Sequence, residues 1–299
     1  MNLRALMYFD ELVRTSSMRA AAENLNVAPT AVSRQIENLE EYFGTPLVER
    51  SSRGVTLTAA GELLAERAGK TLRELGHVHQ LIDDLKGLER GCATIYANGA
   101  TVASLLAPAL SQFSQTYPKL RFEVHITSAR QAIDALVSAQ ADIAITLFAP
   151  KTSEVKILAK REIGYDVILP AEHALASKPK ISLKELATIP MALPEKTFAA
   201  RQAFDALFAQ AGITLDPVFT ASSLELLKEL VLDQAAVTLL PALAIAREIK
   251  SGQMVAIPLS GTKGVRTNME LCVAPDRELS FAAAMLASFI ETFMGNLSK

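Results

Sequence analysis

Residues 18–41 constrain the fold of this chain more than any other stretch. Two segments of helical length flank a four-residue joint at 25–28, and the second segment repeats apolar residues at intervals of three and four. On a helix these apolar residues form one buried stripe: Val32, Ile36, Leu39 and Phe43. The polar residues of the opposite face are Thr30, Arg34, Glu37 and Glu41, with Ser33 at its flank. One face packs while the other points outward, as in a helix-turn-helix.

The residues around this stretch predict the rest of a small helical unit. Apolar residues recur at helical spacing over 3–15, which predicts a first helix, and three consecutive alanines let a second helix over 18–25 approach it closely. Pro29 suits the first position of the third helix because its missing N–H costs nothing there. Gly44 ends that helix after about residue 42.

A short hairpin is predicted directly after the third helix. Apolar runs at 47–48 and 55–57 bracket the polar tip 50–54. Arg50 and Arg53 lie at this tip, where they can meet DNA phosphates or enter a minor groove. Solvation of the hairpin is the alternative role of the two arginines. Beside a helix-turn-helix, the DNA-contact interpretation is favoured.

The pattern changes over residues 58–87 to one long helix without an internal proline. Its apolar residues form two stripes, which exceed what one small domain can cover. The first stripe contains Ala65, Ala68, Leu72, Leu75, His79 and Ile82, and the second contains Leu64, Val78, Leu81 and Leu85. His79 is expected to be packed and neutral. We expect this helix to pair two subunits, so that paired reading helices meet paired DNA half-sites.

The overall charge gives no reason of its own to expect a polyanionic partner. The 299-residue chain has a net charge of −2, and residues 1–61 hold six Arg and Lys against seven Asp and Glu. DNA affinity must therefore rest on a few well-placed arginines and on helix N-termini, doubled by two-fold symmetry. Neither an export signal nor a run of about 18 apolar residues occurs, so a cytoplasmic protein without a membrane partner is expected.

From residue 91 onward, short apolar runs alternate with helical segments, which predicts mostly parallel α/β sheets. Strands are expected near 94–97, 120–126, 142–146, 165–169, 189–193, 236–240, 255–258 and 270–274. Helices are expected near 102–117, 129–139, 198–211, 223–232, 242–250 and 280–294. A change of rhythm near 158–165 predicts two lobes, and the strand near 270 can return the chain to the first lobe. The cleft between such lobes commonly binds a small ligand.

The sequence shows no catalytic or metal-binding motif. Its four histidines are scattered, and neither a Gly-x-Gly-x-x-Gly nor a Gly-x-Ser-x-Gly motif occurs. Cys92 and Cys272 lack the spacing of a zinc site or a disulfide framework. They are expected to be buried thiols, with a redox switch as the alternative. We therefore expect neither an enzyme nor a cofactor, apart from a small organic effector.

The residues resemble LysR-type transcriptional regulators over nearly the whole chain. The match through residues 1–61 has no gap and rests on Ala20, Ala21, Ala22, Leu25, Asn26, Val27, Ala31, Val32, Ser33, Arg34, Gln35, Ile36, Leu39, Glu40, Phe43, Gly44, Pro46, Leu47, Arg50, Arg53, Leu57, Thr58, Ala60 and Gly61. It continues with Leu105, Leu106, Pro108, Phe113, Tyr117, Pro118, Asp142, Ile143, Ala144, Ile145, Pro170, His173, Leu175, Leu239, Leu240 and Pro241. Chance does not produce this much agreement at fixed spacing.

The resemblance implies a winged helix-turn-helix DNA-binding domain, a linker helix for dimerisation and a two-lobed, periplasmic-binding-protein-like α/β effector domain. These fall at 1–58, 59–90 and 91–299, with lobe I at about 91–161 and 267–299 and lobe II at about 162–266. It also implies a homodimer that assembles into a homotetramer, an operator of double-stranded DNA, a small-molecule co-inducer and room for contact with RNA polymerase. The alternative is a DNA-binding regulator whose second domain serves only oligomerisation. A solute-binding protein would share the two lobes but not the winged helix.

For DNA contact, the resemblance points to the start of the third helix and to the tip of the wing. The residues are Pro29, Thr30, Ser33, Arg34, Arg50 and Arg53. Many members begin this helix with Ser-Gln-Pro, whereas this chain has Ala28, Pro29 and Thr30. The glutamine that would read a base is therefore absent. Arg34 can pair with guanine through two hydrogen bonds, worth roughly 1–3 kcal/mol of discrimination.

For the effector, the resemblance points to loops that border the cleft. The residues are Asn98, Gly99, Thr101, Thr127, Ser128, Phe148, Thr197 and Phe198. The first loop precedes a helix whose N–H groups and dipole favour a carboxylate or another anion. Thr101 and Ser128 can also be simple helix caps. Members often carry Gly-x-Gly where this chain has Gln-Ala-Ala at 234–236, so a different pocket shape is expected there.

Overall fold

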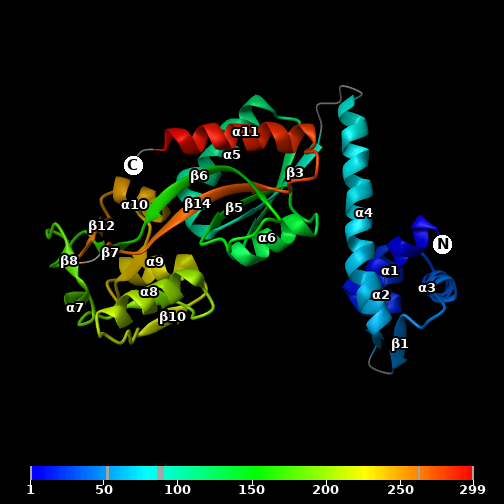
Figure 1. Ribbon diagram of the computed structural model, residues 1–299, viewed down its shortest axis with the longest axis horizontal. Helices are drawn as coiled ribbons and strands as arrows, with labels where there is room; N and C mark the ends of the chain where they lie inside the picture. Colours follow the sequence, from blue (N-terminus) through cyan, green and yellow to red (C-terminus); the bar gives the residue numbers. More distant parts are fainter. Residues whose placement is uncertain (1, 52–53, 86–90, 262, 298–299) are drawn as a thin grey trace. The chain divides into compact units, whose positions relative to one another are not determined.

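The chain divides into two compact units, Met1–Lys86 (blue to cyan) and Gly87–Lys299 (green to red) (Figure 1). The computed structural model describes residues 2–51, 54–85, 91–261 and 263–297.

Three helices form the core of the first unit: α1 (Leu3–Thr15), α2 (Met18–Asn24) and α3 (Pro29–Phe43). They confirm the three predicted helices. The side chain of Ser17 caps α2 by accepting a hydrogen bond from the N–H of Ala20. Pro29 occupies the start of α3, and Gly44 ends it with a left-handed φ of 67°. Local sequence signals therefore set the limits of these helices.

The apolar stripe of α3 packs as predicted at three of its four positions. Val32, Ile36 and Leu39 are fully buried in a cluster that also contains Phe9 of α1. Phe43 is 43% exposed, so its predicted core position is wrong. Phe43 is the last residue of α3, and the chain turns away immediately after it. Its ring contacts Tyr42 edge-on instead.

A two-stranded hairpin follows α3, as predicted, with β1 (Val48–Ser51) antiparallel to β2 (Gly54–Leu57). The carboxylate of Glu40 accepts hydrogen bonds from the N–H groups of Leu47 and Val48 at 2.8 and 3.2 Å. These bonds fix the start of the hairpin to α3. Residues 52–53 at the tip lie outside the described part of the chain, as does the side chain of Arg50.

The predicted long helix is α4 (Ala59–Leu85). Gly61 in its first turn packs so tightly that an added Cβ atom would lie 2.0 Å from the carbonyl oxygen of Leu47. Farther along, large apolar side chains are exposed on the single chain: Leu63, Leu75, Val78 and Ile82. His79, which was expected to be packed, is also exposed there. The expected end of the helix near residue 87 lies outside the described residues.

A five-stranded sheet in the order β4-β3-β5-β14-β6 begins the second unit. Its strands are β3 (Gly91–Ala97), β4 (Leu120–Ile126), β5 (Ile143–Leu147), β6 (Lys156–Gly164) and β14 (Arg266–Val273). β3 pairs in parallel with β4 and β5, whereas β14 pairs antiparallel with β5 and β6. The prediction of mostly parallel sheets is therefore wrong. The chain returns to this sheet from the second lobe, and β14 enters in the opposite direction.

Helices cover both faces of this sheet to form the first lobe (Figure 1). α5 (Ala107–Thr116) and α11 (Phe281–Asn296) pack over one face around a core that contains Phe113 and Ile290. α6 (Ala129–Val137) covers the other face, where Ala144 and Cys272 are buried. The predicted helix from 102 is preceded by a 3₁₀-helical turn, η1 (Gly99–Thr101). It begins with a wider, π-helical turn, η2 (Val102–Leu106).

The second lobe is built around a three-stranded antiparallel sheet, β11-β7-β12. These strands are β7 (Asp166–Pro170), β11 (Thr238–Leu240) and β12 (Met254–Ile257). Two short parallel pairs join β9 (Ala192–Pro194) to β10 (Phe219–Ala221) and β8 (Ile181–Ser182) to β13 (Leu259–Ser260). The helices are α7 (Leu183–Leu186), α8 (Ala199–Gln210), α9 (Leu224–Leu232), η3 (Ala242–Ile245) and α10 (Ala246–Lys250).

β6 is the longest strand that the sequence pattern does not predict. It lies at an edge of the five-stranded sheet and carries the charged residues Lys156, Lys160, Arg161 and Glu162. Edge strands tolerate exposed charges, and here those charges obscure the apolar alternation. The two- and three-residue strands β8, β10 and β13 and the four-residue helix α7 also have no predicted counterpart, because they are too short to show a period.

The chain passes between the lobes at two adjacent points. β6 continues through Tyr165 into β7, and Val265 leads back into β14. The N–H of Tyr165 donates a hydrogen bond to the carbonyl oxygen of Val265 at 3.0 Å. The two crossing segments are therefore tied to each other at the boundary between the lobes.

Candidate DNA-reading surface and ligand cavity

The outward face of α3 carries four of the residues that the sequence predicts for DNA contact. Pro29, Thr30 and Arg34 are exposed, and Ser33 is half-buried. The hydroxyl of Ser33 donates a hydrogen bond to Oε1 of Glu37 at 2.9 Å. The two other predicted residues belong to the wing, where Arg53 and the side chain of Arg50 lie outside the described residues.

Arg34 differs from Arg14 and Arg19 of the first unit in its surroundings. Arg14 forms an ion pair with Glu11 at 3.1 Å, and Arg19 forms one with Glu23 at 2.9 Å. Arg34 has no such partner among the described residues. Its guanidinium group, with donors in a fixed fork, therefore stands in solvent on the outward face of α3.

A cavity of about 690 Å³ opens in the second unit, and residues of both lobes line it. Five of the eight residues predicted for effector contact are among them: Asn98, Gly99, Thr127, Ser128 and Phe198. Apolar side chains supply much of the remaining wall, including Ile126, Leu224, Leu227 and Leu239. The cavity has the size and the largely apolar lining of a small-molecule site.

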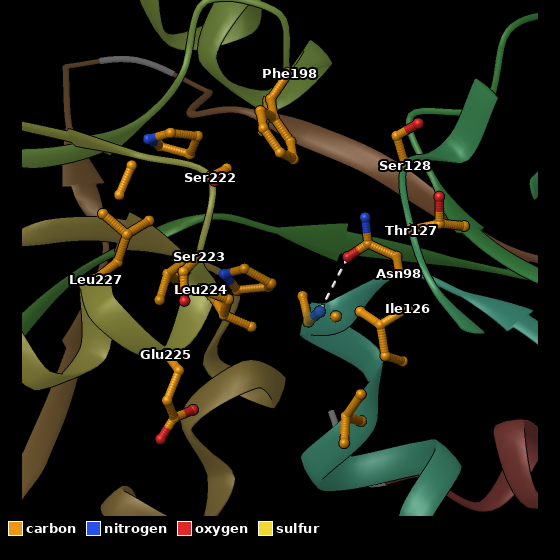
Figure 2. Close-up of a pocket in the computed structure, with 18 of the residues that line it drawn as sticks. Asn98, Ile126, Thr127, Ser128, Phe198, Ser222, Ser223, Leu224, Glu225 and Leu227 are labelled. Carbon is orange, nitrogen blue, oxygen red and sulfur yellow. Dashed lines mark hydrogen bonds between the residues drawn. The ribbon is translucent and has the colours of Figure 1, made fainter. Parts of the chain in front are cut away.

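Four helices begin at the wall of this cavity. Their N-cap residues are Asn98 (η1), Ser128 (α6), Phe198 (α8) and Ser223 (α9). Figure 2 shows Asn98, Thr127 and Ser128 on one side of the pocket and the Ser222–Leu224 segment on the other. Free N–H groups and the positive ends of helix dipoles gather at such starts, so the wall favours an electron-rich ligand group without a cationic side chain.

Local capping bonds hold these polar groups in place. Oδ1 of Asn98 accepts a hydrogen bond from the N–H of Ala100 at 3.0 Å, which leaves its amide NH₂ toward the pocket (Figure 2). The side-chain oxygen of Gln131 accepts hydrogen bonds from the hydroxyls of Thr127 and Ser128 at 2.5 and 2.9 Å. These bonds preorganise the α6 start.

Three predicted effector residues do not line this cavity. Thr101 is fully buried, and its hydroxyl donates to the carbonyl oxygen of Asn98 at 2.8 Å, as a local turn bond. Phe148 packs its ring 5.6 Å from the ring of Tyr165, between the lobe cores. Thr197 is exposed in the turn before α8. Each is one or two positions from a lining residue or packs against one, so the predicted loops border the cavity although these three residues do not line it.

Several lining residues have no counterpart among the predicted ones. Ser222 and Ser223 precede α9, and a serine before an expected helix was the available signal. Gln131 closes the capping box of α6, which the spacing of Ser128 and Gln131 also signals. Tyr165 had no local signal, because its position at the cavity depends on the two crossing segments meeting there.

Tyr165 is a nearly buried wall residue whose hydroxyl has no hydrogen-bond partner among the described residues. Its ring packs against those of Phe148 and Phe204. Burial raises the pKa of Tyr165 well above its ordinary value, so the hydroxyl is neutral. A neutral phenol can both donate and accept a hydrogen bond.

Glu225 is the other ionisable residue that lines the cavity, and its charge is directed elsewhere. Its side chain points away from Asn98 and Thr127 (Figure 2) and pairs with Lys228 at 3.3 Å. Lys228 also pairs with Glu248 at 2.6 Å. Burial lowers the pKa of Lys228, but the bonds to Glu248 and Glu225 outweigh this and raise it. None of the described lining residues is Lys, Arg or His.

The two thiols lie in surroundings that disfavour the reactive thiolate. Burial, followed by the charge of Glu270, raises the pKa of Cys272 to about 12. Burial and the charges of Glu123 and Asp142 also raise the pKa of Cys92. Both cysteines are free, and Cys272 is completely buried, as expected. Cys92 is only partly buried.

Within residues 2–51, 54–85, 91–261 and 263–297, none of the helices combines the length and apolarity needed to cross a membrane. The same residues contain no cluster of three or more His, Cys, Asp or Glu side chains suited to a metal ion.

A winged helix-turn-helix, a long helix and an α/β unit with a ligand-sized cavity define a DNA-binding regulator with an effector domain. Residues 3–62 match the family described as bacterial regulatory helix-turn-helix protein, lysR family, and residues 86–295 match the LysR substrate binding domain. The chain belongs to the LysR family of transcriptional regulators. This is a family of regulators and not of enzymes, so the predicted class is confirmed.

Similar proteins agree over their full length. The RuBisCO operon transcriptional regulator of Allochromatium vinosum is 28% identical, with 97% of this chain and 95% of that protein covered. The dual regulator OxyR of Escherichia coli K12 is also 28% identical, covering 98% and 96%. The structure of full-length CbnR complexed with its target DNA has a TM-score of 0.72 at 20% identity, covering 98% of this chain and all of that one. That structure confirms the fold.

Proposed function

We propose that this regulator recognises an operator in double-stranded DNA through α3 and the tip of the wing. The exposed face of α3 carries the proposal, because Arg34 stands there without a partner among the described residues. The other proposed contacts are Pro29, Thr30 and Ser33 on α3 and Arg50 and Arg53 on the wing. Arg34 reads guanine, and the wing arginines meet phosphates or the minor groove.

Arg34→Ala tests this assignment. Binding to an operator obtained by selection from random DNA should weaken about 5- to 100-fold, while binding to scrambled DNA should change far less. Arg19→Ala is the matched control, because Arg19 is also exposed in the first unit but is paired with Glu23 on α2. Gel-shift titrations at one salt concentration measure both. Retained operator preference in Arg34→Ala would contradict the assignment.

The exposed apolar side chains of α4 support a homodimer formed through the linker helix, which we place at 59–90. A single chain that leaves Leu75, Val78 and Ile82 in water gains stability when a second copy covers them. Two such dimers then form the homotetramer. Leu75→Glu should shift sedimentation toward monomer, whereas Lys70→Glu, which makes an even larger charge change at an exposed polar position of α4, should not.

For the effector, the cavity supports a small organic co-inducer with one carboxylate or similar anionic group on an apolar body. The anionic group is placed at the starts of η1 and α6, beside Asn98, Gly99 and Ser128, where helix N–H groups replace water. Thr127 and Phe198 belong to the same wall. Multiply charged anions are disfavoured, because no described lining side chain is cationic.

A thermal-shift screen against small carboxylates tests the cavity. A ligand present at 100 times its Kd should add about 2.7 kcal/mol to the stability of the second unit. Gly99→Leu fills the cavity, because a side chain there meets Ile126 and Leu224. Gly164→Leu is the matched control at a glycine with open space around it. Compounds that stabilise the native chain and Gly164→Leu, but not Gly99→Leu, bind in the cavity.

The alternative, in which the second unit serves only oligomerisation, predicts no such compounds. An assembly surface needs complementary outer faces and not an inner cavity with four helix starts at its wall. If no small molecule in a broad screen stabilised the native chain, this alternative would replace the co-inducer proposal.

The chemistry of the thiols separates this chain from one kind of signal. Hydrogen peroxide-inducible activators are among its similar proteins. Peroxide reacts with thiolates, and the pKa values of Cys92 and Cys272 are both raised. We therefore propose a signal by reversible ligand binding in the cytoplasm, where the operator DNA lies, with RNA polymerase as the downstream partner.

A further inference from the structure

The outward face of α3 includes a fifth side chain, Glu37, beyond the four predicted for DNA contact. A helix in the major groove reads bases from positions spaced by about three, four and seven residues. Counted from Thr30, these positions are Ser33, Arg34 and Glu37. Glu37 is exposed on α3, one turn after Ser33.

The carboxylate of Glu37 is oriented by its neighbour on this face. The hydroxyl of Ser33 donates to Oε1 of Glu37 at 2.9 Å. The two residues are four positions apart, so the bond holds the carboxylate along the outer face of the helix and lowers the entropy lost on docking. An ionised carboxylate offers about four acceptor sites, so it can accept hydrogen bonds from several donors at once.

An acidic group on a DNA-reading face needs a specific reason, because it repels phosphates and neutralises none of them. The edges of the bases in the major groove supply one. Guanine and thymine present acceptors that repel a carboxylate, and adenine places the N7 acceptor beside its N6 donor. Cytosine presents only its N4–H₂ donor. A carboxylate therefore discriminates for cytosine.

We propose that Glu37 reads a cytosine in each operator half-site by accepting a hydrogen bond from N4–H. This inference rests on the proposed use of α3 as the reading helix. Arg34 and Glu37 are three residues apart, which corresponds to about 4.5 Å along the helix axis. The guanine read by Arg34 and the cytosine read by Glu37 should therefore lie within about two base pairs of each other.

The test is selection of binding sites from random DNA with the full-length chain and two variants. In Glu37→Gln, the preferred base at one position of each half-site should change from cytosine to adenine, because glutamine pairs with adenine N6 and N7. The native preference for cytosine, about tenfold, should fall to about twofold or less in Glu37→Ala.

Glu41→Gln is the matched control, because Glu41 is exposed one turn farther along α3. Both glutamine variants remove one negative charge, so any general gain in affinity is shared. Only Glu37→Gln should change the selected base. Thermal melting of all variants verifies that α3 is folded.

The inference fails if Glu37→Gln selects the native site, or if the native half-site contains no preferred cytosine near the guanine. Arg34→Ala distinguishes this failure from failure of the proposed function. If Arg34→Ala loses its guanine while Glu37→Gln keeps the native site, α3 reads DNA and Glu37 does not. If neither variant changes the selected site, the assignment of α3 as the DNA-reading helix is wrong.

Discussion

The proposed reading face of α3 and the proposed ligand cavity of the second unit are built for recognition by opposite means. The α3 face is exposed and charged, with Arg34 and Glu37 in solvent. The cavity wall has hydroxyls, an amide and four helix starts, and its described residues include no cation. An exposed charge costs little in water, whereas a charge in an enclosed site costs several kcal/mol unless it is paired. Fixed dipoles therefore take the place of charges where water is excluded.

A glycine at a close approach in the unit that carries the α3 face gives the largest expected effect. In the first unit, a Cβ atom on Gly61 would lie 2.0 Å from the backbone oxygen of Leu47. Gly61→Val should therefore destabilise the first unit by about 3 kcal/mol or more. Calorimetry should show the transition of this unit shifted down and that of the second unit unchanged. Loss of both transitions together would show that the units are not independent.

The ion pair between Lys228 and Glu248 lies behind the cavity wall. The two largely buried charges are tolerated there because they pair with each other. Lys228→Met should cost about 2 kcal/mol of stability near pH 7, because Glu248 loses its charged hydrogen bond. The fractional exposures of the Lys228 and Glu248 side chains are 11% and 13%. Lys228→Arg is the control that keeps the positive charge, and urea unfolding measures both variants.

The pH dependence of this effect has a definite sign. Burial raises the pKa of Glu248, but the bond to Lys228 outweighs it and lowers the pKa below its ordinary 4.5. The contribution is therefore present above pH 4.5 and is lost as the pH falls through the lowered value. Lys228 has a raised pKa, so its contribution is present below pH 10.5 and is lost at higher pH. A native-minus-variant difference that stayed constant in acid would contradict this account.

Tyr165→Phe sharpens the comparison on the ligand side. The hydroxyl has no partner among the described residues, so its removal should leave the ligand-free stability within about 0.5 kcal/mol of native. Compounds from the thermal-shift screen that place a polar group against this ring should bind about tenfold more weakly. Isothermal titration measures the affinity. If the native chain bound the polar and the apolar member of a ligand pair with equal affinity, the Tyr165 hydroxyl would not take part in ligand recognition.

The smallest expected effect concerns the thiols. Cys92→Ser should leave stability within about 0.5 kcal/mol of native, because Cys92 is partly exposed on β3. DNA binding should be the same with and without peroxide in the native chain and in this variant. A peroxide effect that Cys92→Ser abolished would show that the thiolate of Cys92 reacts in this unit despite its raised pKa.

The sequence predicts the elements of the first unit because their signals are local. Caps, a proline, a glycine and an apolar period mark α1 to α3, and each lies within a few residues of what it controls. Phe43 is the instructive exception. Its spacing fits the stripe, but the core ends before the helix does. Spacing gives the direction of a side chain and not the extent of the surface that it meets.

In the second unit, the errors share a long-range cause. The direction of β14 depends on where the chain returns from. The charged sequence of β6 has no strand pattern of its own, and β6 is recognised as a strand only by its pairing with β14. For the cavity, the sequence predicts Asn98 and Ser128 because the signals of a helix start lie within a few residues of it. It does not predict Tyr165, because two segments about 100 residues apart in the sequence bring it there. Thr101 was predicted from its place in a loop, but its hydroxyl turns inward to the backbone.

The position of β14 also sets an order for the synthesis of this regulator. β14 lies between β5 and β6, so the five-stranded sheet cannot close until residue 273 has been made. The first unit is complete at Lys86. At the usual bacterial and eukaryotic rates of translation, roughly 10–40 s separate the two events. During that interval a complete first unit is attached to a second unit whose five-stranded sheet still lacks its β14 strand.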